Sequence, residues 1–325
     1  MQKLFIWNLS AIKKQVKINQ DDAIHNNKLS LRIYKYHQYY YLLLPAFIYV
    51  LIFCYGPMYG LQIAFKNYKM SLGVVKSPWV GLRNFSDFFS SYYFWTLMKN
   101  TFVLSFSMLL FSFPVPILVA LIINELNKRY KRLVQTVLYA PHFISTVVLV
   151  GMINIIFSPS MGIINTFLNN LGIASFYFLG SPNCFRPLYI GSGIWQNMGW
   201  NAIVYIAALA SVNPSLHEAA EIDGATRLQR MIYINLHCIM PTIIILLIME
   251  MGRVATISYE KVYLMQNELN LSVSEVIPTY VYKRGIVNNN YSFATAVGLF
   301  NNLINVTMLL MANLISKKFS ETSLF

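Results

Sequence analysis

The sequence predicts an all-α membrane protein, and its composition and the arrangement of its apolar residues both support this. Of 325 residues, 56% are hydrophobic and 11% are charged, and the mean hydropathy is +0.50. Soluble domains carry about 25% charged residues, so much of this chain must lie in lipid. A transmembrane helix needs roughly 20 apolar residues. Six runs of about this length or longer are present, at 39–63, 94–123, 134–157, 188–210, 239–257 and 293–315.

These runs are continuous and do not alternate with polar residues, which favours six transmembrane helices over the strands of a barrel. Lysine and arginine indicate the orientation, because cytoplasmic segments carry the excess of positive charge. Fifteen of the 25 basic residues lie on one side of the membrane, in the segments before the first run and after the second, fourth and sixth runs. Nine lie in the segments on the opposite side, and Arg253 lies inside the fifth run. Both termini are therefore predicted to be cytoplasmic.

The runs define a simple domain organisation. We expect a basic cytoplasmic tail at 1–38 with a weakly amphipathic patch at 4–7, a transmembrane domain at 39–316 and a short cytoplasmic tail at 317–325. The first run follows no apolar stretch with a cleavage site, so it is expected to stay attached as a signal anchor. The external segments 66–93, 158–187 and 258–291 are expected to be ordered. Pro114 and Pro116 are expected to kink the second span without forming a loop.

The cytoplasmic stretch between the fourth and fifth runs, residues 213–236, is built like a helix, a turn and a second helix. Asn213 can cap the first helix, and Gly224 can end it in a left-handed conformation. Two alanines, Ala219 and Ala220, would allow close approach of a partner backbone. Three carboxylates, Glu218, Glu221 and Asp223, would suit a basic groove on that partner. From these residues alone, an ordinary amphipathic connector on the membrane surface is favoured over a docking element.

The order of residues changes that balance. The stretch contains Glu218-Ala219-Ala220, then Asp223-Gly224-Ala225, then Ile234-Asn235-Leu236, and it resembles the EAA loop of ABC importer permeases. His237 stands where that family usually has proline, which leaves the junction with the fifth span open. Similar blocks occur at 80–85, 100–102, 130–145, 259–267, 280–282 and 294–300, and they resemble the branch of carbohydrate permeases for complex oligosaccharides and polysaccharide fragments.

The resemblance implies a fold like that of a type I importer permease in a bacterial inner membrane. It implies that Glu218, Ala219, Ala220, Asp223 and Gly224 couple the chain to a cytoplasmic ATPase dimer. It also implies a second, related permease, an extracytoplasmic binding protein and an oligosaccharide substrate. The chain has no GxxxxGK[ST] stretch. We therefore expect a transport subunit that is not an enzyme and binds no cofactor, with ATP and Mg on the partner ATPase.

Polar residues in the fourth run are candidates for the sugar path. Asn197, Asn201 and Tyr205 recur every four residues, which places them on one helical stripe near Trp200. Amides that bond across helices and an interfacial aromatic belt explain the same residues equally well. Glu250 and Arg253 lie one turn apart and are interpreted first as a self-neutralising pair. Weaker candidates for the sugar path are Asn154, Asn301, Asn302 and Asn305.

Other classes of protein fit less well. A secondary transporter usually has more spans, repeats or intramembrane carboxylates, and only Glu250 is a candidate here. A membrane enzyme would need paired acids, a nucleophile with its base or a metal cluster, and acids cluster only in the 213–236 stretch. The net charge of +13 is spread over span ends, which indicates topology and lipid contacts instead of nucleic acid. The histidines and cysteines show no metal-ligand spacing.

Overall fold

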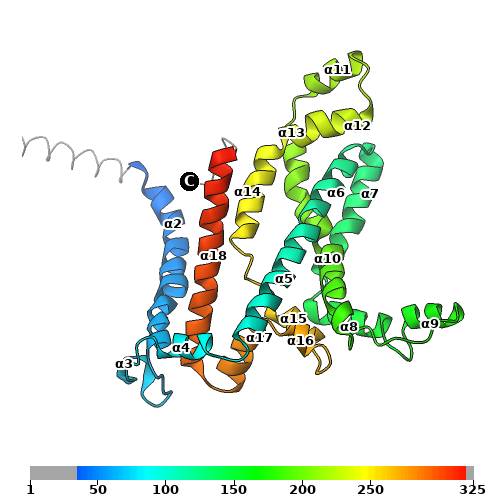
Figure 1. The fold of residues 1–325 in the computed structure, drawn as a ribbon. Helices are drawn as coiled ribbons and strands as arrows, with labels where there is room; N and C mark the ends of the chain where they lie inside the picture. The colour runs from blue at the N-terminus through cyan, green and yellow to red at the C-terminus, as the bar shows by residue number, and fades with distance from the viewer. Residues whose placement is uncertain (1–34, 320–325) are drawn as a thin grey trace, which may run out of the picture. The chain divides into compact units, whose positions relative to one another are not determined.

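The computed structural model describes residues 35–319, so most of the predicted N-terminal tail with its patch at 4–7, and residues 320–325, lie outside the described part. The described chain is almost entirely helical (Figure 1). It divides between Leu61 and Gln62 into two compact units.

The first unit is built on one apolar helical stretch, His37–Phe65, which continues slightly past the division. It consists of α2 (His37–Tyr49), the π-helical η1 (Val50–Tyr55) and the 3₁₀-helical η2 (Gly56–Phe65). No residue of α2 or η1 is buried. A helix that is apolar on all sides suits a lipid environment.

The second unit is organised around the long helix α10 (Pro182–Ala210). It packs against α5 (Phe94–Ser112), α6 (Pro114–Asn124) and α7 (Lys128–Tyr139). At Gly199 the helices α10 and α7 approach so closely that an added Cβ would overlap the carbonyl group of Leu138. No loop forms at the prolines of the second span: α5 ends at Ser112 and α6 begins at Pro114, and Phe113 between them keeps helical backbone angles.

Three described helical stretches are long and apolar enough to cross a membrane: His37–Phe65, Phe94–Asn124 and Tyr291–Lys318. Two bent pairs raise the number to five if each pair is one span. The fourth predicted run lies within α10, which is 29 residues long but is interrupted by polar side chains.

The third predicted run is not a straight helix. The stretch Lys128–Phe143 meets α8 (Thr146–Ile156) at an angle of 96°. Pro141 lies in the intervening 3₁₀ turn η3 (Ala140–Phe143), and the Ser145 side chain accepts a hydrogen bond from the Val148 N–H group, which starts a new helix.

The fifth run is also shorter as a helix than the sequence predicts. It begins with α14 (Met240–Met251), which packs against α18 (Tyr291–Phe319). Twelve residues give a helix of about 18 Å, less than the roughly 30 Å of a hydrocarbon core. Residues 252–258, named the unwound segment below, continue without helical structure.

The two ends of the second unit carry different short helices (Figure 1). One end has α11 (Pro214–Ile222), α12 (Arg227–Arg230), η4 (Met231–Asn235) and α13 (Leu236–Cys238). The other end has α15 (Tyr259–Met265), α16 (Leu271–Ser274), α17 (Ile277–Tyr282) and η5 (Lys283–Val287). The remaining short helices are α3 (Gly73–Lys76), α4 (Arg83–Phe89) and α9 (Ile163–Asn170), so all three segments expected to be ordered contain helices.

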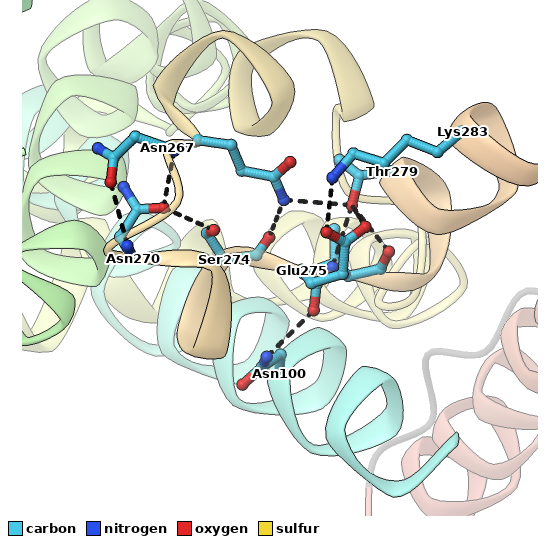
Figure 2. A network of polar contacts seen from close by, with 9 residues as sticks. Asn100, Asn267, Asn270, Ser274, Glu275, Thr279 and Lys283 are labelled. Carbon is cyan, nitrogen blue, oxygen red and sulfur yellow. Dashed lines mark hydrogen bonds and ion pairs between the residues drawn. The ribbon is translucent and has the colours of Figure 1, made fainter. Parts of the chain in front are cut away.

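A buried polar network fastens the α15–α17 end to α5 (Figure 2). The Asn100 amide donates to the carbonyl oxygens of Ser272 and Glu275 at 2.9 and 3.1 Å. The Glu275 carboxylate pairs with Lys283 at 2.6 Å. On the other side of the network, the Asn270 amide donates to the Leu179 carbonyl oxygen at 2.9 Å.

Replacing Asn100 with leucine is therefore expected to destabilise this end of the molecule by about 2–4 kcal/mol. Asn100 is 2% exposed, and its oxygen also accepts a hydrogen bond from Arg186, so the leucine would leave buried polar groups unpaired. Thermal unfolding of the detergent-solubilised complex measures the effect. Asn170→Leu, at an exposed position on α9 with no side-chain hydrogen bond, should leave the melting temperature unchanged. Equal melting temperatures for both variants would contradict the assignment.

Candidate functional site: a polar cavity and a helical loop

A cavity of about 460 Å³ lies within the second unit, lined by α5, α6, α10, α14 and the unwound segment. All four residues predicted for the sugar path line it: Asn197, Trp200, Asn201 and Tyr205. The four-residue spacing therefore marked a face of α10 that borders an internal space and not lipid alone. Aromatic rings and amides together are the groups that bind the faces and hydroxyl groups of sugars.

Two of the four residues also make contacts that hold the protein together. The Asn197 oxygen lies 3.0 Å from Nδ1 of His142, and its amide donates to the Gly193 carbonyl oxygen. Trp200 stacks on His142 with a ring centroid separation of 4.4 Å. The bonding across helices considered for the amides is thus present at Asn197, and Trp200 packs on the same histidine. Asn201 is exposed and its side chain makes no hydrogen bond within the described chain, so its amide is free for a ligand.

Glu250 and Arg253 both line the cavity, at the end of α14 and the start of the unwound segment. Their side chains do not form the self-neutralising pair favoured from the sequence, because the described ion pairs are Arg230–Glu221 and Lys283–Glu275. The link between them is a hydrogen bond from the Arg253 N–H group to the Glu250 carbonyl oxygen. Charged groups inside a membrane usually face a cavity, and here a carboxylate and a guanidinium both do so.

The α5 side of the cavity was missed by the sequence interpretation. Ser105 and Ser112 lie seven residues apart and both line the cavity, with Met108 between them. Ser105 is 7% exposed, and its hydroxyl group has no hydrogen-bond partner within the described chain. The seven-residue spacing was a detectable signal for a shared helical face. Thr256 and Ser258 of the unwound segment also line the cavity, but no such spacing identified them.

A buried cation lies beside the cavity, behind Tyr189 of its lining. Lys261 of α15 is buried, donates to the Tyr189 carbonyl oxygen at 3.0 Å and lies 4.7 Å from the centroid of the Tyr189 ring. Burial lowers the pKa of Lys261 to about 8, because the charged form loses hydration.

The 213–236 stretch has the predicted helix, turn and helix. The Asn213 side chain accepts from the Ser215 N–H group, so α11 starts at Pro214 as expected. Gly224 has φ +77°, and the Ala225 N–H group donates to the Ala220 carbonyl oxygen at 2.8 Å, a left-handed helix end of the expected kind. Thr226 and Gln229 cap α12 reciprocally.

An ion pair and a bend fix the shape of this loop. Arg230 pairs with Glu221 at 3.1 Å, which joins the second helix to the first. The stretch ending at Cys238 meets α14 at 60°, with Ile239 at the break. His237, where the family usually has proline, is exposed in α13, immediately before this bend.

Most of the coupling candidates lie on the surface of the loop: Glu218, Ala219, Asp223 and Gly224 are exposed, and Ala220 is half-buried. Large apolar side chains accompany them, led by Ile222 at 86% exposure and including Leu216 and Leu228. The sequence interpretation named small and acidic residues for the contact and missed Leu216 and Ile222. An exposed apolar group next to carboxylates fits a protein partner better than solvent.

Comparison with known proteins places this fold. The model of the family "Binding-protein-dependent transport system inner membrane component" matches residues 112–321, and the chain belongs to this family. It is thus a membrane transport component and not itself an enzyme.

Two relatives come from Bacillus subtilis (strain 168). "Protein LplB" is 44% identical, over 88% of this chain and 90% of its own length. "Polygalacturonan/rhamnogalacturonan transport system permease protein YteP" is 40% identical, over 92% and 93%. A similar chain occurs in the crystal structure of a bacterial alginate ABC transporter, which was solved in complex with a periplasmic protein bound to an alginate pentasaccharide. That chain matches with a TM-score of 0.82 and 41% sequence identity, and the match covers 90% of this chain and 98% of that chain. This protein is accordingly the inner membrane component of a binding-protein-dependent transport system, and its fold is that of the permease chain in the alginate ABC transporter.

Proposed function

We propose that this chain forms, together with a second related permease, the membrane path of an importer for oligosaccharides delivered by an extracytoplasmic binding protein. Hydrolysis of ATP with Mg takes place on a separate ATPase dimer. The chain crosses a bacterial inner membrane six times within residues 39–316, with both of its tails in the cytoplasm. The observation that carries this proposal is the cavity, because it brings the predicted polar stripe of α10 together with a carboxylate and a guanidinium.

The 213–236 loop and the cavity of the second unit receive separate roles. The loop with Glu218, Ala219, Ala220, Asp223 and Gly224 is the contact with the ATPase, supported by its exposure and its rigid turn. The cavity residues Asn197, Trp200, Asn201 and Tyr205 form the sugar path. Relatives named for polygalacturonan and for the acidic polysaccharide alginate make oligosaccharides of uronic acids the first class to test.

Affinity purification in mild detergent from native cells, followed by mass spectrometry, tests the assembly. A tagged chain should copurify with a second permease of the same family and with a P-loop ATPase. A purification in which the chain is alone and still moves solute would identify a secondary transporter instead. Omitting the tag from an otherwise identical strain provides the control for non-specific capture.

A further inference from the structure

The unwound segment has an unusual position for polypeptide without helical structure. It follows α14 within the fifth apolar run, where a helix would satisfy its own backbone groups. Irregular backbone at membrane depth is tolerated where it is buried in protein or lines a water-filled cavity. Five residues of this segment line the cavity: Arg253, Val254, Thr256, Ile257 and Ser258.

Two asparagines of α18 replace part of the missing helical hydrogen bonding. The Ala255 N–H group donates to Oδ1 of Asn305 at 2.8 Å, and the Asn301 amide donates to the Ala255 carbonyl oxygen at 3.1 Å. The Asn305 amide also donates to the Thr256 hydroxyl group at 2.8 Å. Asn305 is buried, so these bonds are shielded from water. Asparagine is thus used here as a substitute for helix backbone, about fifty residues away along the chain.

Other peptide groups of the segment remain free. Within the described chain, the carbonyl groups of Thr256 and Ile257 and the N–H groups of Ile257 and Ser258 have no hydrogen-bond partner. Thr256 and Ser258 are exposed and line the cavity together with Ile257, so a ligand that enters the cavity can reach this part of the backbone. Backbone N–H and C=O groups are strong hydrogen-bonding groups that take a partner when they are shielded from water. Sugar hydroxyl groups both donate and accept, and they match a surface that offers both kinds of group.

We propose that the unwound segment is a sugar-contacting wall of the cavity, that its free peptide groups bind substrate hydroxyl groups, and that Asn301 and Asn305 are the positioning residues that hold it in place. This inference rests on the proposed function, since it takes the cavity to be the sugar path. It assigns backbone groups to recognition, in addition to the side chains of α10.

The test uses a single cysteine in the wall of the complete transporter. Ser258→Cys is made in a chain whose natural cysteines, Cys54, Cys184 and Cys238, are replaced by alanine, and its rate of modification by a small hydrophilic thiol reagent is measured. Adding Asn305→Leu should change that rate about 5- to 10-fold and lower oligosaccharide uptake per complex, because the leucine cannot bond Ala255 or Thr256. The matched control is Thr307→Leu, at an exposed position of α18 whose hydroxyl group bonds only the Leu303 carbonyl oxygen of the same helix.

The conservative variant Asn305→Asp keeps one oxygen that can accept from the Ala255 N–H group and gains a second that can accept from the Thr256 hydroxyl group, so the rate should stay within about twofold of the parent. A purely general destabilisation of the helix would not follow this pattern of rescue. If Asn305→Leu fails to assemble, Thr256→Val removes only one of the bonds and should still change the rate. The proposal is overturned if Ser258→Cys reacts equally fast in the parent, in Asn305→Leu and in Thr256→Val, in complexes that retain their ATPase. Loss of the ATPase from the parent complex would instead count against the proposed function.

Discussion

Gly224→Val is expected to lower uptake by about 10-fold or more, while the chain still inserts into the membrane. Gly224 has φ +77° with nothing within 4 Å of an added Cβ, so the damage would come from backbone strain and not from a clash. A β-branched residue in this conformation costs about 1–3 kcal/mol, which the exposed loop can relieve by changing its turn. The contact with the ATPase would then lose its shape. Transport assays at matched expression levels measure the effect.

Gly172 provides a matched control for this substitution. It has φ +78° and open space around its Cβ position, but it lies just after α9, away from the α11–α12 loop. Gly172→Val therefore introduces the same strain without touching the proposed coupling surface, and uptake should change by less than about twofold. If both variants lost uptake equally, a general sensitivity to strain would explain the result and the coupling role would fail.

Glu250→Gln and Arg253→Gln are each expected to lower uptake about 10-fold, because hydrogen bonds to charged groups are worth about 1.5–3 kcal/mol. Both residues line the cavity, and their side chains form no ion pair with each other. Independent contacts with substrate should combine additively, so the double variant should lose about 100-fold.

The double-mutant cycle separates this account from the alternative of a neutralising pair. In a pair, either single change would leave one charge unsatisfied in the membrane, and the second change would relieve it. Uptake by the double variant that exceeds uptake by either single variant would show that pairing, and not substrate contact, is what the two residues provide. Asn170→Leu on the surface of α9 is a suitable control for non-specific loss of protein.

Much of the 213–236 loop could be predicted because its signals are local. An N-cap at Asn213, a proline at the next position and a glycine at 224 specify helix ends by their own chemistry, and the structure has each of them. The stripe of α10 was also predictable, because residues four apart share a helical face. That it borders a cavity depends on α5 and α14, which no local pattern on α10 could indicate.

The end of α14 could not be predicted from its own residues. The apolar run continues to Ile257, and hydropathy alone does not show that the helix stops at Met251. The reason lies in α18, where Asn301 and Asn305 provide hydrogen bonds to Ala255. For the third run, by contrast, Pro141 and the capping residue Ser145 were local signals of a break, and the continuous apolar pattern obscured them.

ATP-dependent transport by the reconstituted complex tests whether this chain is part of an ATP-driven importer. The copurified complex is reconstituted into liposomes that contain the binding protein. Labelled oligosaccharides, either from polygalacturonan or from neutral glycans, are enclosed together with the binding protein. Mg-ATP is then added on the side of the membrane that carries the α11–α12 loop. At least one oligosaccharide is expected to leave the liposome interior, where the binding protein is, only when ATP is hydrolysed. Gly224→Val should stop this movement. Transport that proceeds without ATP, or that follows an ion gradient, would contradict this expectation.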